Sequence, residues 1–111
     1  MPPDEVRLRH MLDAARDAVS FTRGRSRTDL DSDRQFVLAL VQCVQIVGEA
    51  AGRVSTETRS RLPDLPWAAI VGMRNRLVHG YYDIDHDEVW STVTRDLPPL
   101  IEALDRALEG R

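Results

Sequence analysis

The sequence has no lysine, one cysteine and no long apolar run, and each of these absences narrows what the protein can be. All 15 basic residues are arginines and 18 residues are acidic, so the formal net charge is -3. A chain with this charge has no overall positive field that would hold duplex nucleic acid non-specifically. Because Cys43 is alone, an internal disulfide and a zinc site built from cysteines are excluded.

The chain also lacks an obvious membrane span or leader. Its longest apolar run, Phe36 to Val41, is far shorter than the ~20 residues that a span requires, and its N-terminus is rich in charged residues. We therefore expect a cytoplasmic protein in a reducing compartment, with no membrane contact. At 111 residues the chain has the length of one domain, so we expect a single domain over residues 1–111.

Charge is unevenly distributed along the chain. Residues 53–76 carry five arginines against Glu57 and Asp64, whereas residues 83–111 carry eight acidic residues against three arginines. Any site for an anion is therefore expected near residues 53–76.

Apolar residues recur mainly with helical spacing, which predicts an all-α protein, a compact bundle of four to five helices. The first helix is expected to begin at Asp4 and to end near Arg23 and Gly24. A capping box of Ser32 and Gln35 is expected to start the second helix, which runs to about Arg53.

The second half of the chain is interrupted by prolines. A short helical turn capped by Ser55 is expected before the third long helix, which starts at Trp67 and runs to about Tyr82. A capping box of Asp85 and Glu88 is expected to start the last helix. Pro98–Pro99 should kink or split that last helix.

The second helix is apolar on two sides. One stripe runs from Phe36 to Ala51, and a smaller face contains Ala39, Cys43, Ile46 and Ala50. A helix with two apolar faces in so small a domain is either central or shared with a second subunit, and we expect both. This pattern predicts a homodimer.

The third helix carries an unusual arginine. On a helical wheel, apolar residues lie within about 60° of Arg74: Trp67, Ile70, Val71, Leu77, Val78 and Tyr81. A guanidinium keeps its charge, and burying it unpaired is unfavourable by several kcal/mol, so an anion must lie nearby. That anion is either internal, with Glu49 as a supporting ion pair, or a ligand.

Two further residues sit close to Arg74 in this pattern. His79 titrates near neutral pH and Tyr81 offers a phenol, and both fall within two helical turns of the arginine. A fixed cation beside such groups suits phosphate chemistry. Each of these residues also has a purely structural interpretation, as a capping histidine or a packed tyrosine.

The segment from Pro66 to Asp85 resembles the HepT family of HEPN-superfamily toxins. The family signature is an arginine followed by a polar residue, then after further spacers a histidine, one residue and a tyrosine, and this chain supplies Arg74, Asn75, His79 and Tyr81. Supporting matches lie at Ile46–Ala51 and in the last helix, so the resemblance covers nearly the whole chain.

This resemblance implies a helical dimer that acts as a metal-independent endoribonuclease, the toxin of a toxin–antitoxin pair. Arg74 and His79 would be its nuclease residues, and Asn75 a supporting polar residue. The implied partner is a minimal nucleotidyltransferase of the MntA type, which transfers AMP from ATP to Tyr81. The adjacent Tyr82 offers a second possible acceptor, and Gln45 stands where an arginine is expected.

Ribonuclease chemistry of this kind needs neither a metal ion nor a cofactor. His79 would take the proton of an RNA 2′-hydroxyl, which attacks the adjacent phosphorus and leaves a 2′,3′-cyclic phosphate. Arg74 would meet the charge that develops on the non-bridging oxygens. In a two-fold dimer, a second His79 would protonate the leaving 5′-oxygen.

Two alternatives use the same residues. In the first, the protein is a non-catalytic binding module that docks a nucleotidyltransferase or binds a nucleotide, with Arg74 on a phosphate. In the second, a metal ion is bound by a cluster whose spacing matches no familiar ligand pattern: His79, Asp83, Asp85, His86 and Asp87.

Overall fold

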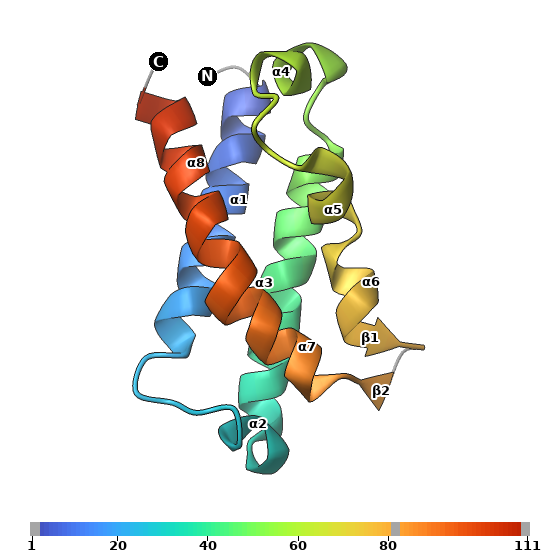
Figure 1. Ribbon diagram of the computed structural model, residues 1–111. Coiled ribbons are helices and arrows are strands. Elements are labelled where there is room, and N and C mark those ends of the chain that lie inside the picture. Colours follow the sequence, from blue (N-terminus) through green and yellow to red (C-terminus); the bar gives the residue numbers. More distant parts are fainter. Residues whose placement is uncertain (1–2, 81–82, 110–111) are drawn as a thin grey trace.

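The computed structural model describes residues 3–80 and 83–109, and it is a bundle of long helices with short elements at its ends (Figure 1). Two of the long helices are α1 (Pro3–Phe21) and α3 (Arg34–Gly52). The third is one continuous helical stretch formed by α7 (His86–Ser91), the π-helical η1 (Thr92–Asp96) and α8 (Leu97–Glu109). The prediction of an all-α protein is confirmed.

Short elements connect these helices. The connection from α1 to α3 contains α2 (Asp29–Ser32), and the connection after α3 contains α4 (Thr56–Arg61). The chain then forms α5 (Trp67–Val71), α6 (Met73–Leu77) and two strands, β1 (Val78–His79) and β2 (Asp83–Ile84). The strands pair antiparallel, with Val78 opposite Ile84 and His79 opposite Asp83.

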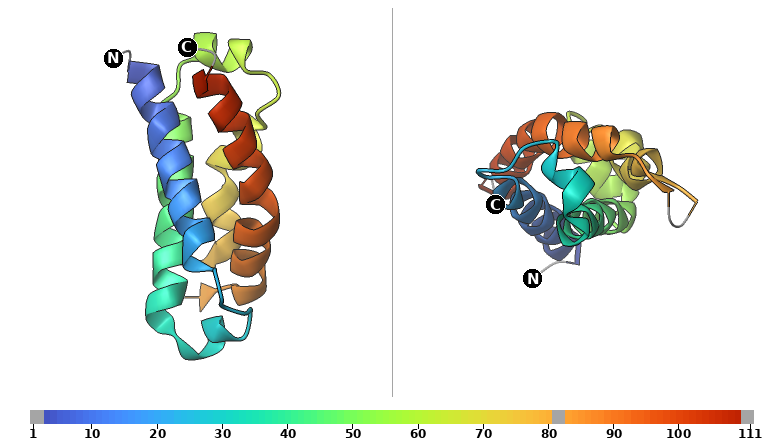
Figure 2. Two further views of the ribbon diagram at one scale, coloured as in Figure 1. Left: turned by 90° about the vertical axis from the view of Figure 1, so that its left-hand side faces the viewer. Right: turned by 90° about the horizontal axis from the view of Figure 1, so that it is seen from below.

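The core lies between α1, α3 and α8: α1 packs along both of the other helices, and the apolar stripes of all three join one cluster of buried residues (Figure 2). Burying one such leucine or valine stabilises the fold by about 1.5–3 kcal/mol. The large side chains that are almost fully buried include Leu8, Met11, Leu12, Leu40, Val44, Val47, Val93, Leu97 and Leu104.

Helix α3 is by its length and composition apolar enough to cross a membrane, although half of it is buried inside the protein. Its buried residues include Cys43 and Ala50 from the smaller of its two apolar faces. Much of the second face is therefore used within the protomer. The core helix of a soluble bundle has this same character.

The N-terminus of α3 differs from its prediction. Asp33, not Ser32, is the capping residue: its backbone is extended and its carboxylate accepts a hydrogen bond from the Phe36 amide at 3.1 Å. Ser32 instead is the last residue of α2, the short helical turn that comes before the cap. The predicted cap of Ser55 on α4 is confirmed, because its hydroxyl accepts from the Thr58 amide.

The last helix adapts to its two prolines through η1. Pro98 and Pro99 have no N–H to donate to the carbonyls of the preceding turn. Immediately before them the chain widens into a π turn, in which the Leu97 amide donates to the Thr92 carbonyl. The predicted start of this helix is confirmed, since the Asp85 carboxylate accepts from the Glu88 amide at 3.1 Å.

Candidate functional site

The segment that carries the predicted site is not one long helix. The helix predicted from Trp67 to Tyr82 is divided at Gly72 into α5 and α6, and it ends at Leu77. Val78 is already extended, and the Asp85 amide donates to the Leu77 carbonyl at 2.7 Å, which closes the hairpin on the end of α6. A helical wheel therefore describes Arg74 but not His79 or the residues after it.

The hairpin turn depends on glycine. Gly80 has a φ of +75°, a conformation that side-chain-bearing residues rarely adopt. Tyr81, the predicted acceptor of AMP, and Tyr82 follow it and lie outside the described residues. Their predicted roles thus rest on the sequence.

Gly48 positions this segment, although it was not among the site residues predicted from the sequence. A Cβ built at Gly48 would lie 3.3 Å from the carbonyl oxygens of Ile70 and Val71, so α5 packs directly on the backbone of α3. Ala68, a small residue of α5 itself, is exposed and does not provide this close approach. A glycine in the middle of an apolar helix was the signal for such a contact.

Arg74 lies on α6 beside α3, half-buried rather than at the centre of a buried stripe. Neighbouring Val71 is 43% exposed, which shows that this face of the segment reaches the surface. The Arg74 Nε is shielded from solvent and has no hydrogen-bond partner among the described residues. The guanidinium lies beside an open space and forms no ion pair with another described residue.

The ion pair expected between Arg74 and Glu49 is not formed in residues 3–80 and 83–109. Glu49 instead accepts a hydrogen bond from the side chain of Gln45, one turn earlier on α3, at 3.0 Å. Both charged residues nevertheless line one open hollow of about 500 Å³, which we call the Arg74 hollow. Its lining consists of Gln45, Gly48, Glu49, Gly52, Val71, Arg74 and Asn75.

The structure therefore brings Arg74 and Asn75 together at one hollow and leaves room there for a ligand. Asn75 is exposed next to Arg74, with its side chain available to the same space. A planar guanidinium beside an amide can bind the oxygens of a phosphate. Of the two sources of an anion foreseen from the sequence, the internal one, Glu49, lines the hollow but forms no ion pair with Arg74 among the described residues; the second is a ligand.

His79 is on β1, and it does not line the Arg74 hollow. Its side chain is 60% exposed, and its Nε2 lies 3.9 Å from a carboxylate oxygen of Asp85. This distance is too long for a hydrogen bond, but it places a carboxylate beside the imidazole. The same Asp85 caps α7, so the carboxylate beside the imidazole is fixed in place.

The side chains of the proposed metal cluster are directed to other partners. His86 Nδ1 lies 3.0 Å from Asp31, and Asp87 forms an ion pair with Arg27. No group of three or more His, Cys, Asp or Glu side chains in the described parts of the chain could hold a metal ion.

Cys43 is a packing residue. It is buried on α3 without a disulfide partner, and burial raises the pKa of its thiol. A thiol in this state is a poor nucleophile.

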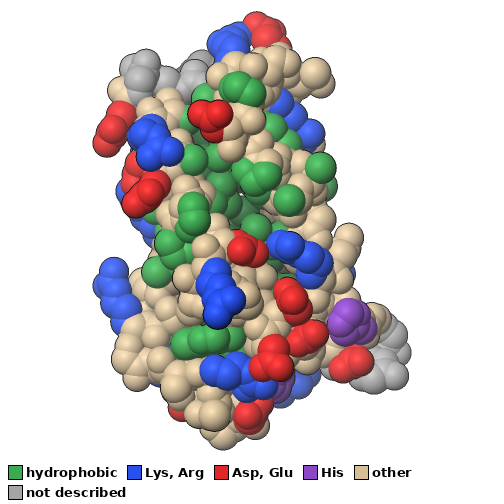
Figure 3. All heavy atoms as spheres, in the orientation of Figure 1, with side chains coloured by type: hydrophobic (Ala, Val, Ile, Leu, Met, Phe, Trp, Pro, Cys, Tyr) green, Lys and Arg blue, Asp and Glu red, His purple; other side chains and the backbone are tan. Residues whose placement is uncertain are grey.

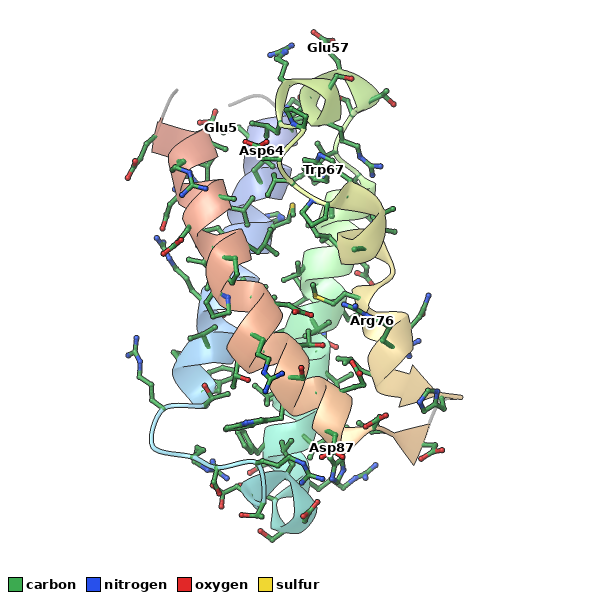
Figure 4. All side chains as sticks on the ribbon, in the orientation of Figure 1. Glu5, Glu57, Asp64, Trp67, Arg76 and Asp87 are labelled. Atoms are coloured by element: carbon green, nitrogen blue, oxygen red, sulfur yellow. The ribbon has the colours of Figure 1, made fainter. Side chains whose placement is uncertain are left out.

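A second hollow, of about 370 Å³, lies between α8 and the α5–α6 segment. Apolar side chains gather there on the face seen in Figure 3. Asp64 and Arg76, at its two ends, are labelled in Figure 4. Arg76 is engaged by Asp96 at 3.5 Å, and Arg95, the other arginine of the described lining, is exposed, so neither is a shielded, unpaired cation like Arg74.

Comparison with known proteins matches this chain to ribonucleases. The profile of the family described as "Ribonuclease HepT-like" matches residues 11–107. A protein of Methanocaldococcus jannaschii with the name "putative RNase" is 30% identical over 81% of this chain and 83% of its own length. A "Probable ribonuclease HepT" of Thermococcus cleftensis is 31% identical over 72% of this chain and 73% of its own length. No solved structure matches significantly.

Proposed function

The chain belongs to the HepT-like ribonuclease family, and from that premise we propose that it is an endoribonuclease that cleaves RNA without a metal ion. The observation that carries this proposal is Arg74, whose shielded guanidinium Nε has no partner in the described chain and whose side chain lines an open hollow with Asn75. An uncompensated guanidinium in such a place is suited to receive a phosphate.

In the proposed reaction the substrate supplies its own nucleophile. His79 takes the proton of a 2′-hydroxyl, the 2′-oxygen attacks the adjacent phosphorus, and the bond to the 5′-oxygen breaks to leave a 2′,3′-cyclic phosphate. Asp85, 3.9 Å from the His79 ring, stabilises the imidazolium that forms. Arg74 stabilises the charge on the non-bridging oxygens.

A homodimer would complete the reaction, because the leaving 5′-oxygen needs a proton and one histidine would otherwise have to serve twice. In a two-fold assembly the second His79 supplies that proton. Light scattering should give the mass of a dimer at micromolar concentration, whereas a monodisperse monomer would contradict this step. Gly72→Arg should weaken the dimer if the exposed Ala68 and the half-buried Gly72 lie at its seam.

The decisive experiment measures cleavage of a labelled RNA in the presence of a chelator. Wild-type protein should cleave it, and His79→Ala and Arg74→Ala should each be slower by about 10²-fold or more. Because Arg74 has no ion pair to lose in the described structure, Arg74→Ala should remain folded by circular dichroism. Full activity of His79→Ala would refute the mechanism, and an inert wild-type protein would favour the non-catalytic binding module.

We further propose that the protein is the toxin of a cytoplasmic toxin–antitoxin pair, controlled by a partner nucleotidyltransferase. The phenol oxygen of Tyr81 would attack the α-phosphorus of ATP, and pyrophosphate would leave. The resulting phosphodiester adds a negative charge and a bulky adenosine close in sequence to His79, which should inhibit by charge and by occupancy.

Mass spectrometry after incubation with the partner, ATP and magnesium tests this control. The expected result is one AMP on Tyr81, with Tyr81→Phe active and no longer inhibited. An adduct on Tyr82 alone would move the site by one residue, and inhibition without an adduct would show control by complex formation.

A further inference from the structure

The five arginines of residues 53–76 fall into two groups in the folded protein. Three are engaged by other groups: Arg59 with the Ala51 carbonyl, Arg61 with Glu57 and Arg76 with Asp96. The other two, Arg53 and Arg74, have no ion pair within residues 3–80 and 83–109. Both border the solvent-facing side of α3.

Arg53 has basic neighbours from a different helix. It lines a small hollow of about 140 Å³ with Arg7 and His10, which α1 supplies. The Nε of Arg7 is shielded from solvent and, within the described chain, lacks a hydrogen-bond partner, as does that of Arg74. The fold has thus placed shielded arginines on both sides of α3.

The small hollow and the Arg74 hollow are adjacent, because Glu49 lines both. Together they make one surface that crosses α3 from α1 to α6. In the right-hand view of Figure 2, α3 lies on the opposite side of the bundle from the last helix. We call this surface the α3 face. It carries four basic residues, Arg7, His10, Arg53 and Arg74, against the single acid Glu49.

We propose that the α3 face binds the backbone of single-stranded RNA, with Arg53 and Arg7 holding phosphates beyond the one that Arg74 receives. This inference rests on the proposed function, since it assigns the substrate path of the same site. The face is locally basic on a chain whose net charge is -3, so it attracts a polyanion although the chain as a whole does not.

The lining of the α3 face also indicates how the RNA would be read. Among the described residues that line its hollows none is aromatic and could stack on a base, and the guanidinium groups there match phosphate oxygens. Binding should therefore follow the backbone and tolerate many sequences.

A second copy of the chain fits the α3 face less well than RNA does. A two-fold contact centred on this face would place its basic residues against the same basic residues of the partner subunit. Like charges brought together in this way oppose association.

The test measures RNA binding separately from cleavage. In a His79→Ala background, the dissociation constant of a labelled single-stranded RNA is followed by fluorescence anisotropy over a range of salt concentrations. Arg7→Gln/Arg53→Gln should lower the slope of log K against log salt by about 1.4, because each lost phosphate contact in a single strand contributes about 0.7. Glu49→Gln should have the opposite effect and strengthen RNA binding, because it removes a negative charge from the α3 face.

Two matched variants serve as controls. Arg9→Gln/Arg106→Gln removes the same charge from exposed arginines that line neither hollow and have no ion pair in the described structure, and its slope should stay that of the parent. Gly52→Asp adds a carboxylate inside the Arg74 hollow, where a Cβ meets no atom within 4 Å, and should weaken binding; Gly52→Ala should not.

An unchanged salt slope in Arg7→Gln/Arg53→Gln would overturn the proposal. An equally lowered slope in the control Arg9→Gln/Arg106→Gln would overturn it too. A loss of dimer mass without a change in RNA binding would assign the α3 face to subunit contact instead. Arg53→Gln alone, at an exposed position, keeps the test valid if the double variant folds poorly. Binding as expected by a wild-type protein that cleaves nothing would refute the proposed reaction and leave this inference standing.

Discussion

Two regions of the molecule are built in different ways. The framework of α1, α3 and α8 consists of helices of 13 to 19 residues whose apolar stripes pack into one core. The segment of residues 67–85, which carries Arg74 and His79, consists of two helices of five residues and two strands of two residues. Elements so short are unstable alone, so the framework must hold the site in place. Stability and activity should therefore respond to different substitutions.

The largest effect on stability should come from the framework. Leu104 on α8 is fully buried, and Leu104→Ala should lower the free energy of unfolding by about 2–5 kcal/mol through lost burial and the cavity left behind. Chemical denaturation measures this. Leu38→Ala, at a leucine that is 45% exposed, should stay within about 0.5 kcal/mol of wild type. Similar losses in both would contradict this assignment of the core.

The contact between the two regions should affect activity more than stability. Gly48→Ala adds a Cβ 3.3 Å from two carbonyl oxygens of α5, which must shift by a few tenths of an ångström. The alanine gains about 1 kcal/mol of helix propensity against an overpacking penalty of about 1–3 kcal/mol, so the net loss of stability should be small. Displacing Arg74 should slow RNA cleavage about tenfold.

Gly52→Ala is the matched control for that experiment, because no atom lies within 4 Å of its added Cβ. It should leave cleavage unchanged. If Gly48→Ala cleaved RNA at the wild-type rate, α5 and α6 would be positioned by other contacts.

The cap of α3 gives a smaller effect within the framework. Asp33→Ala should destabilise the protein by about 1 kcal/mol, because the Phe36 amide loses its acceptor. Ser32→Ala should change the free energy of unfolding by less than about 0.5 kcal/mol, since Ser32 only ends α2. Thermal unfolding of the two variants decides which residue is the cap, and the reverse order would restore the prediction from the sequence.

The smallest effect is electrostatic and depends on pH. Arg25 lies 2.9 Å from Asp33, and this hydrogen bond, together with one from the Phe36 amide, lowers the pKa of Asp33. A lowered pKa stabilises the fold above the ordinary value of about 4, and that stabilisation disappears as the pH falls through the lower value of the folded state. Arg25→Gln should therefore lower the melting temperature slightly at pH 7.

The difference from wild type should shrink below pH 4. A small constant difference should remain, because Arg25 also stacks on the Phe36 ring at 4.1 Å, a contact that does not titrate with Asp33. Arg23→Gln, at an exposed arginine without an ion pair in the described structure, is the control and should show no pH dependence. A difference that grows toward acid would reverse the sign and contradict the assignment.

The framework could be predicted because its information is local. Periodic apolar residues defined α1, α3 and α8, and the caps Ser55 and Asp85 followed from residue type and spacing. At the start of α3, Ser32 and Asp33 both had the chemistry of a cap. Asp33 is the cap of α3 because residues 29–32 fold into α2, which ends at Ser32.

By itself the sequence determined the helical framework, the position of the family motif and the charge bias of residues 53–76. The tertiary structure decided what those residues do together. It ended α6 at Leu77, because the hairpin offered its carbonyl the Asp85 amide, and it left Arg74 without Glu49. It also brought Arg7 beside Arg53, 46 positions away, across two packed helices. Such juxtapositions arise from the packing of separate elements, which periodicity along one element does not encode.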